Sequence, residues 1–467
     1  MSTHPDHSLT LKPLLSVHDH HETAIVPFWE AFRVWLKIGF INFGGPAGQI
    51  ALMHRLLVDE RRWISETRFL HALNYCMLLP GPEAQQLAVY LGWLMHRTWG
   101  GLVAGLLFIL PGFLLMVGIA VLYVSFGQLH WMQGLLFGMQ AATLAIVVEA
   151  VMRIGKKALK NRWLYALAAA AFIAIFAFAV PFPVIILVAG LIGLAGAKFM
   201  PTLFLPAGKK PSDLNDESMP EQQAEPAGTS GAWLLGVLVV GLLLWFTPVL
   251  LLWLALGPGN VFTQESVFFS KMAVVTFGGA YAVLAYMAQQ AVQQYHWLAP
   301  GEMVQGLALA ETTPGPLILV LTWVGFLGAY RAPGGLDPLL AGVLGATLST
   351  WVTFVPCFLW IFLGAPYIER LRGNRWLSAA LTGITAAVVG VILNLSMWFS
   401  LHVLFSDVGQ WQGWGLSLPV PHWASLDIAA LVLGAGAMLA MLRFHAGLIR
   451  TLLVCALLGL LLRMSGI

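Results

Sequence analysis

The sequence is poor in charge and in cysteine. Only 10% of its 467 residues are Asp, Glu, Lys or Arg, where soluble proteins have about 25%. This shortage argues against soluble enzymes and nucleic-acid-binding proteins. The three cysteines, Cys76, Cys357 and Cys455, lie in apolar stretches without CxxC or Cys/His spacing, which argues against disulfide scaffolds and zinc sites. We therefore expect no metal, no cofactor and no nucleic-acid partner.

Hydrophobic residues take the place of the missing charge. They make up 59% of the chain, and the mean hydropathy is +0.81. Runs such as 163–180 and 233–256 reach the roughly 18 apolar residues that indicate a membrane-spanning helix. The sequence thus predicts an all-α polytopic membrane protein surrounded by the lipid bilayer. Its mild net charge of +3 suits the basic loops of a bacterial inner-membrane protein.

Two segments have the composition of soluble chain. Residues 1–24 hold scattered His and Asp without the basic and apolar regions of a signal peptide, so we expect a disordered cytoplasmic tail. Residues 201–231 are rich in Pro, Gly, Glu, Gln and Ser, which is linker composition. These segments delimit two membrane units, 25–200 and 232–467.

The second unit repeats the first. Three motifs recur 234 residues apart, namely Phe43-Gly44-Gly45 and Phe277-Gly278-Gly279, Trp63 and Trp297, and Pro80-Gly81-Pro82 and Pro314-Gly315-Pro316. Farther along, Pro111 matches Pro356 at an offset of 245, so 11 residues are inserted in the second unit. Duplicated membrane units are typical of transporters.

The distribution of basic residues predicts that the two units are inverted. Lys and Arg gather in 55–68, 153–162 and 370–375, and the counterparts of these segments in the other unit, 289–302, 398–407 and 125–130, contain none. Because short basic loops lie on the cytoplasmic side, matching loops fall on opposite sides of the membrane.

Three apolar stretches lie between basic segments 55–68 and 153–162. Both segments can be cytoplasmic only if one of these stretches does not cross the membrane. A helix cannot run through Pro80-Gly81-Pro82, so we expect a re-entrant hairpin there and another at Gly44-Gly45-Pro46. Applied to both units, this argument predicts about nine full crossings and four hairpins, with a cytoplasmic amino end and a periplasmic carboxyl end.

Four breaks at membrane depth require an internal cavity, because exposed backbone is tolerated there only beside protein or water. Each break also places the positive end of a half-helix near the midplane, which suits an anion. The backbone candidates for substrate binding are Gly44, Gly45, Pro80, Gly81, Pro82, Gly278, Gly279, Pro314, Gly315 and Pro316. The alternative for these residues is tight packing or a kink.

Several polar side chains near the breaks are further candidates. Lys37 and Lys271 occupy matching positions and could neutralise a dianion, or snorkel to the interface instead. The candidate hydrogen-bond donors are Asn42, Gln85, Gln86, Thr312 and Thr313, which could equally join helices. Glu83 and Glu311 are candidates for proton coupling, since protonation would remove their repulsion of an anion; the alternative is a cap or packing role. We predict no catalytic residue.

The quoted motifs belong to longer stretches that resemble a known family. FGGPAGQIALMHRLLVDERRWIS at 43–65 and NYCMLLPGPEAQQLAVYLGW at 74–93 have second-unit versions, TFGGAYAVL at 276–284 and WLAPGEMVQGLALAETTPGPLILV at 297–320. Together they resemble the long, two-domain members of the chromate ion transporter family. The resemblance implies efflux of chromate across the bacterial inner membrane and chromate resistance, with sulfate as a similar oxyanion.

Energetics favours export, because each anionic charge moving outward gains about 2.3 kcal/mol per 100 mV. Proton antiport and exchange with sulfate stay open, as does a homodimer. The rival functions are a carrier of sulfate or another oxyanion and, in a different class, a membrane enzyme or a scaffold. The sequence has no HExxH, no GxGxxG after a strand and no vicinal cysteines to favour the enzyme.

Overall fold

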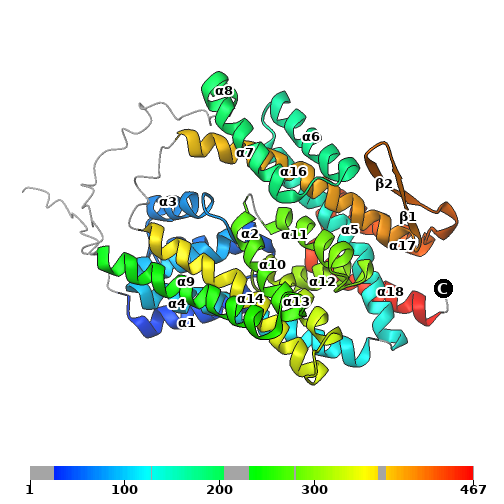
Figure 1. The fold of residues 1–467 in the computed structure, drawn as a ribbon, viewed down its shortest axis with the longest axis horizontal. Coiled ribbons are helices and arrows are strands. Elements are labelled where there is room, and N and C mark those ends of the chain that lie inside the picture. Colours follow the sequence, from blue (N-terminus) through cyan, green and yellow to red (C-terminus); the bar gives the residue numbers. More distant parts are fainter. Residues whose placement is uncertain (1–25, 128, 205–230, 278–279, 366–374, 466–467) are drawn as a thin grey trace, which may run out of the picture.

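Helices make up nearly all of the computed structural model, which describes residues 26–127, 129–204, 231–277, 280–365 and 375–465. One group of long helices, α5, α7 and α16, lies beside a second group, α4, α9 and α14, with the shorter helices α10 to α13 between the two (Figure 1). The predicted tail at 1–24 and most of the predicted linker at 201–231 lie outside the described residues. The prediction of an all-α polytopic membrane protein is confirmed.

The first unit consists of α1 (Phe28–Ile41), α2 (Gly45–His54), the π-helical turn η1 (Arg55–Glu60), α3 (Glu66–Cys76), α4 (Glu83–Phe126), α5 (His130–Ala158), α6 (Arg162–Phe178) and α7 (Phe182–Phe199). The predicted linker begins with a short helix, α8 (Pro201–Phe204). The second unit consists of α9 (Gly231–Leu256), α10 (Val261–Val275), α11 (Ala280–Gln289), the π-helical turn η3 (Gln290–Gln294), α12 (Pro300–Thr312), the 3₁₀ turn η4 (Leu317–Leu319), α13 (Val320–Arg331), α14 (Pro338–Gly364), α16 (Arg375–Leu404), the strands β1 (Val408–Gly413) and β2 (Leu416–Pro421), the 3₁₀ turn η6 (Trp423–Ser425), α17 (Ile428–Phe444) and α18 (Leu448–Met464).

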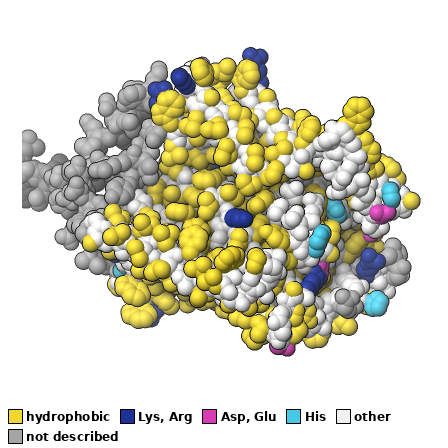
Figure 2. Space-filling view, viewed as in Figure 1, with side chains coloured by type: hydrophobic (Ala, Val, Ile, Leu, Met, Phe, Trp, Pro, Cys, Tyr) yellow, Lys and Arg dark blue, Asp and Glu magenta, His cyan; other side chains and the backbone are white. Residues whose placement is uncertain are grey.

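The outer surface has the composition of a lipid-facing surface. Within the described ranges, six helices are long and apolar enough to cross a membrane, and α6, α17 and the 317–331 segment are shorter apolar helices. Hydrophobic side chains cover most of the face shown in Figure 2, and charged side chains on it are few. Helix α9 buries only Trp245, so nearly all of its apolar surface is left for lipid.

All four predicted helix breaks are present. Helix α1 ends at Ile41 and α2 begins at Gly45; α3 ends at Cys76 and α4 begins at Glu83. In the second unit α10 ends at Val275 and α11 begins at Ala280, and α12 ends at Thr312 before η4 begins at Leu317. Gly278 and Gly279 lie outside the described residues.

The glycines allow the chain to turn at these breaks. Gly81 has φ +130° and Gly315 has φ +105°, and both Gly44 and Gly45 also have positive φ, a region that L residues rarely adopt. The first half-helix of α4 ends at a kink, since His96 and Arg97 are not helical. Residues 83–95 thus form a hairpin arm, and the rest of α4 is a separate long helix.

Equivalent positions share unusual backbone as well as sequence. The π-helical turns η1 and η3 follow α2 and α11, and the left-handed Arg62 and His296 lie 234 residues apart. Local geometry therefore repeats with the motifs, which agrees with duplication. The sidedness of the two units and the count of full crossings stay predictions.

A small β-hairpin is the exception to the helical fold. The Trp-rich composition of residues 398–423 indicates an exterior interfacial loop. In the structure residues 398–404 end α16, and β1 then pairs antiparallel with β2 from Val408 and Pro421 to Gly413 and Leu416. Pairing of the two strands satisfies backbone N–H and C=O groups that would have to form hydrogen bonds with water in an irregular loop.

Candidate functional site

The breaks of the two units are joined to one another. The N–H of Gly81 donates to the carbonyl of Thr276 at 2.8 Å, and the N–H of Gly315 donates to Oδ1 of Asn42 at 2.5 Å. Gly81 and Gly315 are equivalent residues, and so are Asn42 and Thr276. Each PGP glycine is therefore hydrogen-bonded to the residue that precedes FGG in the opposite unit, as a pseudo-twofold arrangement requires.

The long helices behind the breaks repeat this arrangement. A β-carbon placed on Gly112 of α4 would lie 2.1 Å from the carbonyl oxygen of Pro314, and one placed on Gly81 would lie 2.9 Å from Sγ of Cys357 in α14. Gly112 and Cys357 match at the offset of 245 residues. Each PGP turn thus packs against the long helix of the other unit, at a glycine in one case and a cysteine in the other.

A small cavity lies where the half-helices begin. Its walls are the first residues of α2, α4 and η4, namely Pro46, Gln49, Pro82, Glu83, Ala84, Pro316 and Leu317. The space open to the centre of a water molecule is about 10 Å³, which is room for about one water. A tetrahedral oxyanion needs more space, so this conformation is closed.

Backbone donors face this region without a protein partner. The first N–H groups of a helix have no intrahelical acceptor, and neither Glu83 nor Ala84 nor Leu317 donates a backbone hydrogen bond to another part of the described chain. The meeting of three half-helix starts also brings together the positive ends of three helix dipoles. The starts of α2, α4 and η4 therefore meet at one cavity, and their position at the membrane midplane stays a prediction.

Three buried glutamines near these helix starts have unsatisfied polar atoms, and one of them, Gln49, lines the cavity. Gln49 donates to the carbonyls of Asn42 at 3.0 Å and Gly315 at 2.5 Å, and Gln86 donates to the carbonyl of Pro80 at 2.8 Å. Gln85 is fully buried, and neither its Nε2 nor its Oε1 has a partner within the described chain. A buried amide without a partner costs about 1–3 kcal/mol, which marks it as a group that a ligand or water satisfies.

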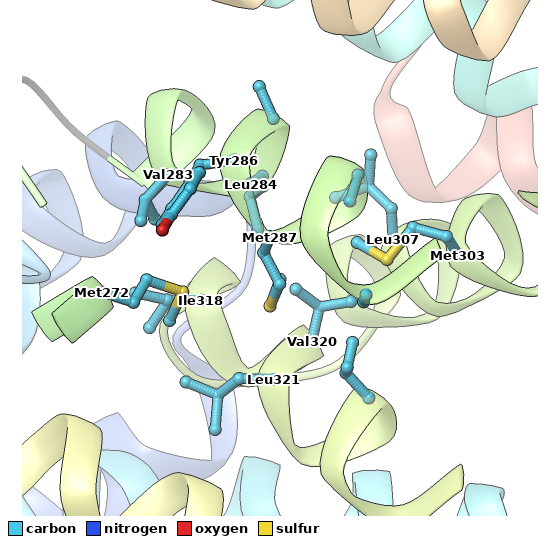
Figure 3. Close-up of a cluster of buried hydrophobic side chains, with 14 of the residues drawn as sticks. Met272, Val283, Leu284, Tyr286, Met287, Met303, Leu307, Ile318, Val320 and Leu321 are labelled. Atoms are coloured by element: carbon cyan, nitrogen blue, oxygen red, sulfur yellow. The ribbon is translucent and has the colours of Figure 1, made fainter. Parts of the chain in front are cut away.

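The corresponding surface of the second unit is apolar. Val283, Val320 and Leu321 lie with Met272 and Met287 in a buried cluster between α10, α11, α12 and α13 (Figure 3). Val283 is equivalent to Gln49, and Val320 is equivalent to Gln86. The polar side chains of the cavity therefore come from the first unit.

Two carboxylates lie beside the breaks. Glu83 lines the cavity and is partly exposed, with no ion pair or side-chain hydrogen bond to the described residues. Glu311 is buried on α12, where its Oε1 accepts a 2.6 Å hydrogen bond from the hydroxyl of Tyr281. Tyr281 is the second residue of α11, so Glu311 reaches the start of that half-helix.

The other side-chain candidates lie away from the cavity or have partners. Lys37 and Lys271 are both exposed, and neither forms an ion pair with the described residues. The hydroxyl of Thr312 donates to the carbonyl of Leu309 at 2.8 Å and that of Thr313 to the carbonyl of Ala310 at 3.2 Å. In this conformation both threonine hydroxyls therefore donate to carbonyls near the end of α12. Asn42 also donates, to the carbonyl of Phe108 at 3.3 Å.

The sequence argument missed Gln49, Tyr281, Gly112 and Cys357. Gln49 could have been predicted from the sequence, because it lies four residues after Gly45 and therefore on the same face of α2 as that break residue. Nothing in the sequence indicates that Gly112 contacts Pro314, since that contact joins the two units.

The chain was compared with known proteins. A family model described as chromate transporter matches residues 29–194 and again 263–460. The chain belongs to the chromate transporter family. Both stretches contain one FGG and one PGP break, so the family's characteristic sequence coincides with the two sets of half-helices. The protein is thus a multi-pass membrane transporter.

Curated relatives extend over most of the chain. A chromate transport protein of Pseudomonas aeruginosa is 34% identical over 78% of this chain and 79% of its own length. One of Cupriavidus metallidurans is 29% identical over 77% of this chain and 79% of its length. A probable chromate transport protein of Synechococcus elongatus is 28% identical over 85% and 93% respectively. No solved structure matches the chain.

A larger cavity lies farther along α11. It has about 110 Å³ open to water centres, and it is lined by parts of α6, α11, η3, α16 and both strands. Its polar lining includes Gln289, Gln293, Asn394, His402 and Gln410, with no Asp, Glu, Lys or Arg. Nδ1 of His402 lies 2.9 Å from the carbonyl of Trp398; since a carbonyl only accepts, Nδ1 carries the proton. Neutral amides and an imidazole suit brief contact with an anion.

Proposed function

We propose that the protein exports chromate across the bacterial inner membrane. The observation that supports this most is the closed cavity between half-helix starts of both units, where the first N–H groups of Glu83, Ala84 and Leu317 are unpaired. The partnerless amide of Gln85 lies on the first turn of α4, directly after the lining residues Glu83 and Ala84. Such donors suit an oxyanion, and the relatives are named for chromate transport.

The direction follows from the membrane potential. An outward-moving dianion gains about 4.6 kcal/mol per 100 mV, twice the value for one charge, so export needs no coupling ion. In the predicted topology the larger cavity lies on the periplasmic side, and chromate would pass along α11 from the breaks to this vestibule. The amino end is then cytoplasmic and the carboxyl end periplasmic.

Substrate recognition is assigned to backbone and amide groups. Gln85, Gln86, Asn42, the turns at Gly44-Gly45 and the two PGP segments contact the anion once the hairpins separate. Lys37 and Lys271 contribute positive charge from the outer faces of their helices, about 10 Å of helix rise before each break. Glu83 and Glu311 respond to the anion through their protonation. Sulfate, a tetrahedral dianion of similar shape, is the competing substrate.

Transport into everted membrane vesicles tests the proposal. Vesicles that contain the protein should accumulate chromate, and an imposed interior-positive potential should raise the rate. Vesicles without the protein serve as the control. If sulfate is accumulated and chromate is not, the protein is a sulfate carrier; if neither is accumulated, the proposed function is wrong.

A further inference from the structure

A third carboxyl, remote from the cavity, has no partner in the part of the chain that the structure describes. Glu265 of α10 is fully buried, and neither Oε1 nor Oε2 has a hydrogen-bond partner among the described residues. The three nearby hydroxyls on α10 are engaged elsewhere: Thr263 donates to Leu252, Ser266 donates to Thr263, and Ser270 accepts from Trp245. Glu265 therefore lies in an environment that offers nothing to a negative charge.

Two glycines make the space for this carboxyl. A β-carbon placed on Gly328 of α13 would lie 2.7 Å from Oε1 of Glu265, and one on Gly345 of α14 would lie 3.0 Å from Oε2. The carboxyl is thus enclosed between α10, α13 and α14. At Gly328 a carboxyl oxygen is the first atom that an alanine would meet. At Gly345 a β-carbon would first meet the carbonyl oxygen of Gly325 at 2.3 Å and Cβ of Ala329 at 2.5 Å, so that glycine serves the crossing of α13 and α14 as well.

No charge compensates Glu265 from any neighbouring helix. The titratable groups on α10 itself and on the helices that pack against it (α9, α11, α13 and α14) are Lys271, Tyr281, Tyr286, Tyr330, Arg331 and Cys357. None of them forms a hydrogen bond or ion pair with Glu265, and Lys271 is exposed. An ionised carboxylate without water or a partner is far costlier to bury than a neutral carboxyl.

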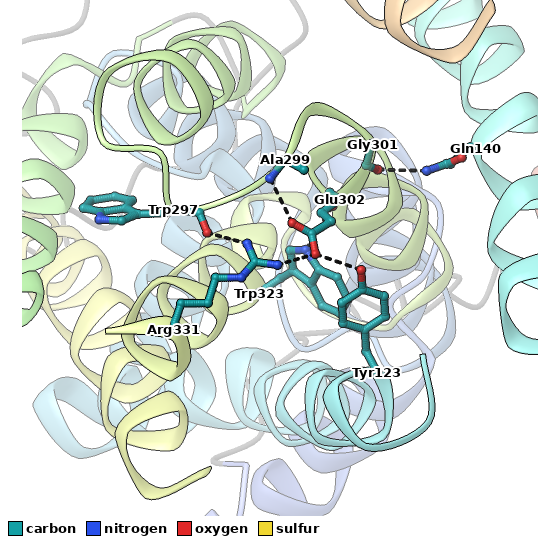
Figure 4. Close-up of polar contacts among 8 residues, drawn as sticks. All are labelled: Tyr123, Gln140, Trp297, Ala299, Gly301, Glu302, Trp323 and Arg331. Atoms are coloured by element: carbon teal, nitrogen blue, oxygen red, sulfur yellow. Dashed lines mark hydrogen bonds and ion pairs between the residues drawn. The ribbon is translucent and has the colours of Figure 1, made fainter. Parts of the chain in front are cut away.

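A polar cluster covers the end of α13 one turn beyond Gly328. Arg331 binds Glu302 at 2.5 Å and the carbonyl of Trp297 at 2.7 Å, and Tyr123 donates to the same carboxylate at 2.8 Å (Figure 4). The ring of Trp297 borders Gly328. Trp297 therefore joins this cluster to the glycine that contacts the Glu265 carboxyl.

We propose that Glu265 is a further proton-binding residue of the transport cycle, in addition to Glu83 and Glu311. Its place in a transport cycle rests on the proposed function, and its protonation in the closed conformation does not. In the closed conformation one oxygen of Glu265 holds a proton that it has taken from a hydronium ion, which leaves as water. When the α10 arm moves away from α13 and α14, water reaches the carboxyl, the O–H bond breaks and the proton returns to water.

Helix α10 connects this proton to the substrate. It leads from Glu265 to Thr276, about 16 Å of helix rise away, and the carbonyl of Thr276 accepts the N–H of Gly81 at the joint between the breaks. A movement of the α10 arm that separates this joint also uncovers Glu265. Protonation therefore favours the closed conformation, and loss of the proton favours the open one.

Infrared spectroscopy of the reconstituted protein tests the proposal directly. The C=O band of protonated carboxyl groups at pH 7 should be weaker in Glu265→Gln than in the wild type, and chromate uptake by this variant should vary less with pH. Glu60→Gln is the matched control, because Glu60 is an exposed carboxylate and its removal should leave the band unchanged. A band unchanged in Glu265→Gln overturns the proposal.

A second variant distinguishes loss of the carboxyl group from misfolding of the protein. Glu265→Leu supplies an apolar side chain of similar size, and a neutral pocket should accept it, so both variants should accumulate in the membrane like the wild type. If neither accumulates, a charge at 265 is needed for the fold and the proposal is wrong. Absence of chromate transport by the wild type would refute the proposed function instead, and would leave the infrared result to decide about Glu265.

Discussion

The two units share a backbone design and differ in the chemistry that they place on it. The first unit has buried amides where the second is apolar: Gln49, Gln85 and Gln86 correspond to Val283, Leu319 and Val320. The second unit has buried carboxyls where the first is apolar: Glu265 and Glu311 correspond to Ala31 and Met77. After duplication, the symmetric frame was kept and the side chains diverged.

This difference suggests a division of labour between the units. Amides can donate to an oxyanion without adding charge, and carboxyls in an apolar environment can exchange a proton. The first unit would then recognise the anion while the second responds to protons. The joint at Gly81 and Gly315 connects the two activities mechanically. The comparison can be tested by giving one unit the residue of the other.

The largest effect is expected at Gly112. Gly112→Cys introduces the residue found at the equivalent position 357, and its β-carbon would meet the backbone of Pro314 at 2.1 Å. Because backbone cannot yield as a side chain does, we expect little folded protein in the membrane. The reverse change, Cys357→Gly, removes a side chain and should leave most of the protein folded. Membrane protein amounts, measured by immunoblot, check both; equal accumulation would contradict the packing described here.

The next effect concerns Asn42. Asn42→Leu leaves the N–H of Gly315 buried without its acceptor, at a cost of about 1–3 kcal/mol. Asn42→Thr introduces the second-unit residue, which retains an oxygen near this position, and should be less damaging. Thermal unfolding of the purified variants measures the difference. If Asn42→Leu is as stable as the wild type, the joint between the units does not contribute to stability.

The two lysines should matter less. Lys37→Gln and Lys271→Gln each remove a charge from an exposed helix face, so we expect a loss of chromate uptake of about two- to fivefold, the range of a weak electrostatic interaction of roughly 0.5–1 kcal/mol. Lys37→Arg should be close to the wild type. A loss of more than about tenfold in vesicle uptake would mean that the lysines turn inward to contact the substrate.

The smallest effect is a pH dependence of stability at Glu302. Burial alone would raise the pKa of Glu302, but its hydrogen bonds with Arg331, with the N–H of Ala299 and with Tyr123 outweigh burial and hold the pKa below its usual value. The stabilisation is therefore complete above the usual pKa of about 4.5 and is lost as the pH falls through the lower, folded value. Glu302→Gln should unfold at a lower temperature than the wild type at pH 7, with the difference shrinking towards pH 3.

The sequence was sufficient to predict the helical membrane fold and the positions of the breaks, because Pro and Gly act locally on the backbone. It could not predict that the hydroxyls of Thr312 and Thr313 donate hydrogen bonds to carbonyls of their own helix. Nor could it predict that Lys37 and Lys271 are exposed. Contacts between the units decide which face of a half-helix meets the cavity. The environment of Glu265 likewise becomes apparent only from the structure, where Gly328 and Gly345 lie against its carboxyl.

Chromate uptake by everted vesicles that contain the wild type or Gln85→Leu is the most direct test of the account. The change introduces the residue of the second unit at 319, removes two unpartnered polar atoms and should not destabilise the protein. We predict an unchanged amount of folded protein and a half-saturation constant raised at least about tenfold, which corresponds to roughly 1.4 kcal/mol of lost recognition. An unchanged half-saturation constant would contradict the assignment of anion recognition to the first unit.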